Sequence, residues 1–86
     1  MTDTQDNLIR MANRIGDFFQ AWPDRTAGID GIANHIEKFW EPRMRRQILA
    51  FLDAHPQGVS NSGLALHDIV REALQAHRSR LEPAPA

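Results

Sequence analysis

Two nine-residue stretches of this chain, MANRIGDFF at residues 11–19 and IANHIEKFW at residues 32–40, repeat one another at a shift of 21 residues. In both copies the apolar side chains recur at the spacing of one helix face. Each copy is soon followed by a proline, Pro23 or Pro42, which disfavours helical geometry at the residue before it. The pattern predicts two helices that form a hairpin and face one core. Convergence of two helices on that core and internal duplication both explain the likeness.

The apolar positions extend these two helices beyond the repeat. The first helix is expected to bury a stripe that comprises Leu8, Met11, Ala12, Ile15, Phe18, Phe19 and Trp22. Its start can be capped by Asp6 or Asn7, and the start of the second helix by Asp24, Thr26 or Asp30. Gly28 and Gly31 would weaken the second helix by about 1 kcal/mol each if they lie in its interior.

A third helix is expected to begin at Pro42, because proline suits the first helical turn. Its inward face would carry Met44, Ile48, Phe51 and Leu52, whereas Leu49 lies well off that face. A loop at 54–63 follows, and a fourth helix would start between Ser62 and His67 and run to about Arg80. The sequence thus predicts an all-α bundle of about four helices, with a disordered tail at 1–6, one domain at 7–81 and a Pro/Ala tail at 82–86.

Composition excludes several classes of protein. The 86 residues contain no cysteine, so neither disulfides nor thiolate metal sites can support so small a core. A net charge of −1 provides no bulk attraction to nucleic acid or to a membrane surface. The polar N-terminus lacks the features of a signal peptide, and no apolar run approaches the roughly 20 residues of a membrane span. We therefore expect a cytoplasmic protein.

No catalytic or metal-binding pattern is present in the sequence. The four histidines, none of which pairs with another at the i, i+4 spacing of a helical metal site, are His35, His55, His67 and His77. Ser60 and Ser62 have no evident base and orienting group, which an activated nucleophile needs. The glycines do not form a phosphate-binding loop. We expect a chain that is not an enzyme and that binds no cofactor or metal.

The junction between the second and third helices is the predicted docking surface. Arginines beside an aromatic residue are typical of interface hot spots. The predicted partner-binding residues are His35, Lys38, Phe39, Trp40, Arg43, Arg45, Arg46 and Leu49. A solvated helix end is the plainer explanation of the arginines. The alternative function is a small helical DNA- or RNA-binding module that uses Arg43, Arg45 and Arg46, although the balanced charge argues against it.

The isolated chain is expected to be either a self-associating oligomer or a marginally stable monomer. A chain of this length without disulfides or metals gains little net stability from its core. A two-fold dimer formed through the repeated aromatic helix ends would cover the same patch twice. Met11 and Met44, in contrast, are expected to fill gaps within the core.

Residues 8–74 resemble the delta subunit of soluble NAD-dependent formate dehydrogenase. The most specific string is I-A-N-H-I-x-K-F-W-x-P-R-M-R, at residues 32–45. The family residues that it matches here are His35, Lys38, Phe39, Trp40, Pro42, Arg43, Met44 and Arg45. No catalytic role attaches to them, and the resemblance leaves open whether they touch a partner or only shape the bundle.

The resemblance implies a cofactor-free accessory or stabilising subunit, or a maturation helper, of a cytoplasmic molybdenum or tungsten enzyme. That enzyme oxidises formate to carbon dioxide and reduces NAD. Its other subunits would carry bis-molybdopterin guanine dinucleotide, iron–sulfur clusters, FMN and the NAD site, and the large molybdenum subunit would be the partner. Whether the small chain stays bound after assembly, and which face docks, remain open at this stage.

Overall fold

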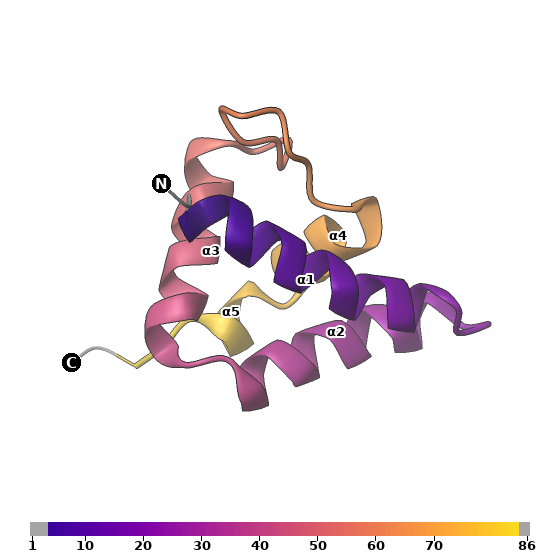
Figure 1. Cartoon of the computed structure of the whole chain (residues 1–86). Helices are drawn as coiled ribbons and strands as arrows, with labels where there is room; N and C mark the ends of the chain where they lie inside the picture. The colour runs from indigo at the N-terminus through magenta and orange to yellow at the C-terminus, as the bar shows by residue number, and fades with distance from the viewer. Residues whose placement is uncertain (1–3, 85–86) are drawn as a thin grey trace.

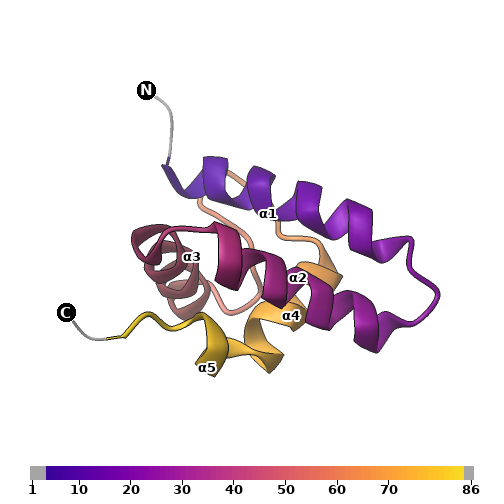
Figure 2. The same cartoon turned by 90° about the horizontal axis from the view of Figure 1, so that it is seen from below.

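The first two helices form the predicted antiparallel hairpin. In the computed structural model, which describes residues 4–84, α1 (Thr4–Gln20) and α2 (Arg25–Phe39) run side by side (Figures 1 and 2). Asp24 caps α2, because its Oδ1 accepts hydrogen bonds from the backbone N–H groups of Thr26 and Ala27. The chain therefore reverses between Gln20 and Arg25, as the position of Pro23 predicted.

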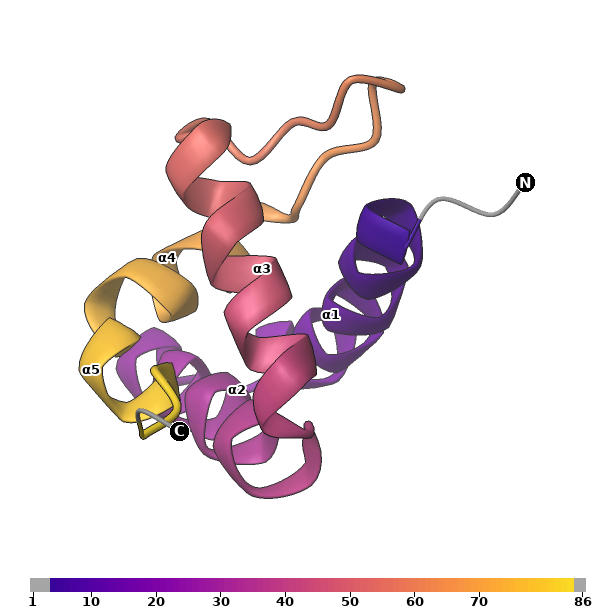
Figure 3. The same ribbon diagram turned by 90° about the vertical axis from the view of Figure 1, so that its left-hand side faces the viewer.

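Three further helices cover one side of this hairpin. They are α3 (Pro42–Ala54), α4 (Asp68–Ala76) and the short α5 (Arg78–Leu81). Pro42 occupies the first turn of α3, as predicted. In Figure 3, α1 lies to the right, α2 at the bottom and α4 and α5 to the left, with α3 crossing in front of them. The all-α class is confirmed, and residues 4–84 contain no strand beyond one isolated bridge.

Both ends of the predicted domain need correction. Helix α1 already begins at Thr4, so the tail predicted at 1–6 is wrong for residues 4–6, and residues 1–3 lie outside the described part. Asp6 is a buried residue of α1 rather than its cap. The fourth helix is shorter than predicted, because the backbone leaves helical geometry at His77 and α5 follows separately. Residues 82–84 are not helical, and 85–86 lie outside the described part.

The core lies between the hairpin and α3, α4 and α5. Its fully buried large side chains are Ile9, Ile32, Ile36, Ile48, Phe51, Val70, Leu74 and Leu81. Trp40 and Leu49 belong to the same cluster, with 6% and 3% of their surfaces exposed. Both are therefore core residues of this structure, whereas the sequence analysis placed them on the docking surface. Helix α3 packs against both α1 and α5, which explains why its apolar positions are buried on more than one side.

Two glycines allow the helices to approach closely. A Cβ atom on Gly16 would collide with Cγ2 of Val70, so this glycine sets the distance between α1 and α4. A Cβ atom on Gly31 would collide with the ring of Phe19, which lies directly over α2 at that point. Gly31 lies in the interior of α2, where a glycine weakens the helix. Its missing side chain leaves the space that the Phe19 ring occupies.

The loop between α3 and α4 is pinned to α1 by side chains. The Asn13 amide donates from Nδ2 to the Ala65 carbonyl (2.9 Å), and its Oδ1 accepts from the His67 N–H (2.8 Å). Nearer the start of α1, the Ser62 hydroxyl donates to Oδ2 of Asp6 (2.7 Å). This hydrogen bond is the main cause of the lowered pKa of Asp6. The loop extends to His67 rather than to 63, and it covers part of the inner side of α1.

Candidate protein-docking surface

The opposite side of the hairpin carries large apolar side chains that nothing covers. The exposed fractions are 40% for Met11, 64% for Phe18, 42% for Trp22 and 72% for Phe39. Met11 and Phe18 lie on one stripe of α1, and Trp22 follows just after the end of that helix. Met11, predicted to fill the core, is therefore an exposed residue. One further large hydrophobic side chain, Val59, is exposed in the loop at 42%.

A shallow groove of about 410 Å³ runs between α1 and α2 on this side. Hereafter the outer groove denotes the surface lined by Phe18, Phe19, Trp22, Ala27, Asp30, Gly31, Asn34, His35 and Phe39. Its aromatic rings already contact one another. The Phe19 ring meets Phe18 and Trp22 at centroid distances of 4.9 Å in both cases, and His35 lies 4.8 Å from Phe39. Rings held in this way lose little conformational freedom when they bind a partner.

The sequence repeat gives each helix one aromatic side chain for the core and one for the surface. Phe18 corresponds to Phe39, and both are exposed. Phe19 corresponds to Trp40. The ring of Phe19 packs against the core, and Trp40 lies within it. The repeat was read correctly as a helical pattern, but its first aromatic position belongs to the outer groove in both copies.

Nearly all the carboxylates of the described chain are engaged within it. Arg80 holds Asp30 and Glu37, and Arg78 holds Asp53 and Glu82. The hydrogen bonds that both arginines donate to these carboxylates raise the pKa of Arg78 and of Arg80. The remaining engaged carboxylates, each with its partner, are Asp6 with Ser62, Asp17 with His67, Asp24 with the start of α2, Asp68 with Arg71 and Glu72 with Arg25. Within residues 4–84, Glu41 alone among the acids has a side chain that forms no hydrogen bond or ion pair.

The basic side chains are distributed differently. Those without a hydrogen bond or ion pair in the described chain are Arg10, Arg14, Lys38, Arg43 and Arg46, although Arg10 does lie close enough to Asp6 to lower its pKa. All five are exposed, and all belong to α1, the end of α2 or the start of α3. Arg14 is a helical neighbour of Met11 and Phe18, and Lys38 is a helical neighbour of His35. Unpaired positive charge therefore flanks the outer groove on both helices.

The predicted docking residues do not form one surface. His35 and Phe39 line the outer groove, and Lys38 lies beside it. Arg45 turns inward, where its guanidinium Nη1 donates a long 3.5 Å hydrogen bond to the Leu81 carbonyl and its Nε has no partner. Arg46 borders a separate hollow with Asp53 and Arg78. The arginine cluster proposed for nucleic-acid binding is thus divided between solvent and the α3–α5 contact.

Sequence reasoning missed the α1 half of the outer groove. Phe18 and Trp22 were assigned to a buried stripe because their spacing is helical. The signal that could have placed Phe18 correctly is its equivalence in the repeat to Phe39, which was predicted to contact a partner. No comparable signal distinguishes Met11 from Ile32, its equivalent in the second copy.

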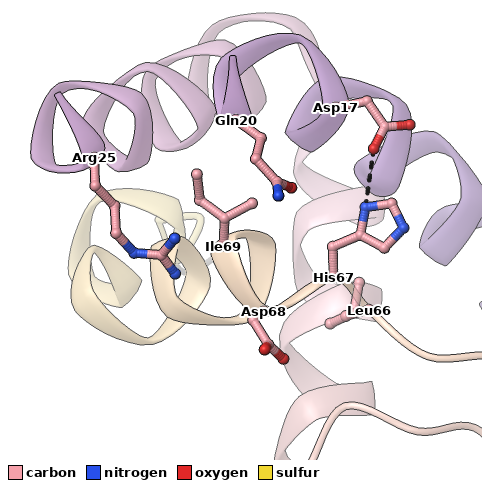
Figure 4. A pocket seen from close by; sticks show the side chains of 7 residues that line it. All are labelled: Asp17, Gln20, Arg25, Leu66, His67, Asp68 and Ile69. Carbon is pink, nitrogen blue, oxygen red and sulfur yellow. Dashed lines mark ion pairs between the residues drawn. The ribbon is translucent and has the colours of Figure 1, made fainter. Parts of the chain in front are cut away.

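A second hollow, of about 550 Å³, lies at the other side of α1 (Figure 4). Its lining residues are Asp17, Gln20, Arg25, Leu66, His67, Asp68 and Ile69. His67 Nδ1 lies 3.1 Å from Asp17 Oδ1, and Arg25 pairs with Glu72 at 2.7 Å. A histidine oriented by an aspartate could activate a nucleophile, but these seven residues include no serine, threonine, cysteine or lysine. The pairs are exposed, and the arrangement is that of a polar surface hollow.

Neither a membrane span nor a metal cluster is found in the described residues. No helix among residues 4–84 is both long and apolar enough to cross a bilayer. The same residues contain no group of three or more histidine, cysteine, aspartate or glutamate side chains that could hold a metal ion.

Comparison with known proteins gives one match. A family model described as NADH-dependent formate dehydrogenase delta subunit FdsD matches residues 7–74 of the 86. No curated protein and no solved structure gives a significant match to the chain. The matched segment includes the whole of α2 and α3, most of α1, the pinned loop and most of α4.

Proposed function

Since this chain belongs to the family of NADH-dependent formate dehydrogenase delta subunits, we propose that it is a non-catalytic accessory subunit. It acts by contact with the large molybdenum subunit of a cytoplasmic enzyme, either as a permanent component or as a maturation helper. The molybdopterin cofactor, iron–sulfur clusters, FMN and NAD site belong to the partner subunits. The observation that carries the proposal is the family match over residues 7–74.

The distribution of side chains supports a contact role. Three exposed aromatic side chains, among them Phe39 at 72% exposure, line the outer groove of the α1–α2 hairpin. Exposed apolar patches on a small monomeric domain usually mark an interaction site. The charged side chains of the second hollow, in contrast, compensate one another within the chain. Contact with another subunit would remove these exposed apolar side chains from water.

An accessory subunit of this kind stabilises its partner by mass action. A protein that binds only the folded form of another raises its stability in proportion to the logarithm of its concentration over Kd. At about 100 times Kd, the gain is about 2.7 kcal/mol. Such a gain is enough to change the amount of assembled enzyme without any residue of this chain taking part in formate oxidation.

Deletion and co-purification test the proposal. Affinity-tagged chain, expressed in its own cells during growth with formate, is expected to bring down a molybdenum-containing subunit with NAD-reducing formate oxidation activity. Deletion of the gene should lower that activity, and the tagged copy should restore it. The same tag on an unrelated small helical protein is the control. Loss of the gene without any change in formate oxidation, together with no molybdenum in the purified fraction, would refute the proposal.

A further inference from the structure

We propose that the outer groove binds a segment of the large molybdenum subunit that carries carboxylates beside apolar side chains. This inference rests on the function proposed above and assigns the docking surface within it. We prefer it to the α2–α3 corner because Trp40, the aromatic residue expected there, is buried in the core. The outer groove, with Arg14 and Lys38 beside it, supplies both chemical requirements of such a contact.

The apolar part of the contact is provided by rings that are rigid and already exposed. Phe39, packed against His35, lines the groove at the end of α2, and Phe18 on α1 and Trp22 just after α1 line it as well. The Phe19 ring fills the floor, because Gly31 leaves room for it. Interfaces obtain most of their affinity from a few aromatic or arginine side chains of this kind near their centre. The groove offers three such aromatic side chains in one continuous surface.

The electrostatic part of the contact depends on the charged side chains that have no partner within the chain. The net charge of −1 conceals an asymmetry, because the acids are largely neutralised by Arg25, Arg71, Arg78 and Arg80 within the chain. The unpaired charge that remains next to the groove is positive, from Arg14 on α1 and Lys38 on α2. Asp30, which also lines the groove, is held by Arg80 at 2.7 Å. Complementarity therefore selects an acidic partner.

The same charges disfavour a second copy of the chain as the occupant. In a two-fold dimer, each surface meets an identical surface. Arg14 and Lys38 would then meet the arginine and lysine of the other copy, and Asp30, the carboxylate among the residues that line the groove, is already held by Arg80. Like charges brought together across an interface oppose association. The aromatic rings favour self-pairing, whereas their charged flanks oppose it.

Binding to formate dehydrogenase isolated from a strain that lacks this chain tests the inference. The enzyme is immobilised, and the purified chain is titrated by biolayer interferometry at low and moderate salt. Phe39→Ser removes an aromatic anchor, and the double variant Arg14→Glu/Lys38→Glu reverses the flanking charge. Matched controls are Val59→Ser, an exposed apolar residue elsewhere, and Arg46→Glu, an unpaired arginine on α3. Circular dichroism confirms that each variant folds.

Phe39→Ser is expected to weaken binding about 30-fold, the equivalent of one hot-spot residue. The double charge reversal should slow association and remove most of its salt dependence. Val59→Ser and Arg46→Glu should bind like the wild type. If both groove variants also bind like the wild type, the groove is not the docking surface, although the accessory function stands. A loss confined to Arg46→Glu would place docking on α3 and overturn the inference.

Two other outcomes bear on the proposal. If the wild-type chain does not bind the enzyme at all, both the accessory function and this inference fail. Sedimentation of the free chain provides the second check. A wild-type dimer that Phe39→Ser converts into a monomer would show that a second copy occupies the groove. A wild-type monomer that binds the enzyme through Phe39 and the flanking cations is the result that supports the inference.

Discussion

The two sides of the α1–α2 hairpin carry apolar side chains at the same helical spacing, yet only one side is covered. Ile32 on the inner side is fully buried, whereas Met11, its equivalent in the repeat, is 40% exposed. Asn13 makes two hydrogen bonds to the α3–α4 loop, whereas Asn34 borders the open groove. A repeated local pattern therefore does not determine burial. Burial depends on which neighbouring element reaches each position.

The largest contrast is expected between Ile32→Ala and Met11→Ala. Truncation of the fully buried Ile32 leaves a cavity and should lower the free energy of unfolding by about 2–5 kcal/mol. The equivalent change at Met11 should cost much less, about 0.5 kcal/mol, because Met11 lies at the surface and its truncation leaves no enclosed cavity. Urea titration followed by circular dichroism measures both. Equal losses for the two variants would show that the two sides contribute equally to stability.

Gly16→Ala tests how closely the inner side is packed. The new methyl group would collide with the buried Val70, and overpacking of this kind costs about 1–3 kcal/mol. Alanine is better than glycine in a helix by about 1 kcal/mol, so a net destabilisation of about 1 kcal/mol is expected. Ala50→Gly, at an exposed position of α3, measures the propensity effect separately. A Gly16→Ala variant that is more stable than the wild type would contradict a close α1–α4 contact.

Asn13→Ala and Asn34→Ala compare the same residue in the two copies of the repeat. Loss of the Asn13 amide leaves the Ala65 carbonyl and the His67 N–H without partners, and we expect destabilisation of about 1–2 kcal/mol. The side chain of Asn34 makes no hydrogen bond within residues 4–84, so its replacement should leave thermal stability almost unchanged. Amide hydrogen exchange should be faster in the loop of Asn13→Ala only. Faster exchange in both variants would argue against a specific clamp.

The smallest effect concerns Asp6, whose pKa lies below its ordinary value of 3.8 chiefly because of the Ser62 hydrogen bond. A carboxyl group with a lowered native pKa stabilises the fold above its unfolded pKa, and this stabilisation disappears as the pH falls through the native pKa. The wild type should therefore exceed Asp6→Asn in stability at neutral pH, and the difference should shrink below about pH 4. Ser62→Ala should reduce the difference. A gap that is independent of pH would rule out this linkage.

Local signals in the sequence correctly predicted the hairpin and several helix ends. Asp24 caps α2 and Pro42 occupies the first turn of α3. Both could be predicted because their effects depend only on neighbouring backbone atoms. The helix break at His77 is not marked by a glycine or a proline in the sequence. In the first turn of α1, Asp6 accepts a hydrogen bond from Ser62, which is 56 residues away in the sequence. Such long-range contacts leave no mark in a window of neighbouring residues.

The candidate site was predicted in part, for a physical reason. Phe39, His35 and Lys38 were placed on a partner surface because they lie near the end of an amphipathic helix. Trp40 was assigned to that surface with them, but the two adjacent residues point in different directions from the helix axis, and α3 and α5 complete a core around Trp40. The availability of charge could not be predicted at all. It depends on pairs such as Arg80 with Asp30, which only the fold brings together.

Hydroxyl-radical footprinting of the chain, free and assembled with formate dehydrogenase, tests most directly whether the inner side holds the fold and the outer side binds the partner. In the free chain, Met11, Phe18, Trp22 and Phe39 should all react, whereas Trp40 should be protected. After assembly, the outer-groove residues Phe18, Trp22 and Phe39 should lose most of their reactivity, while Val59 keeps its own. Equal reactivity of Phe39 and Trp22 before and after assembly would show that the partner does not cover the outer groove.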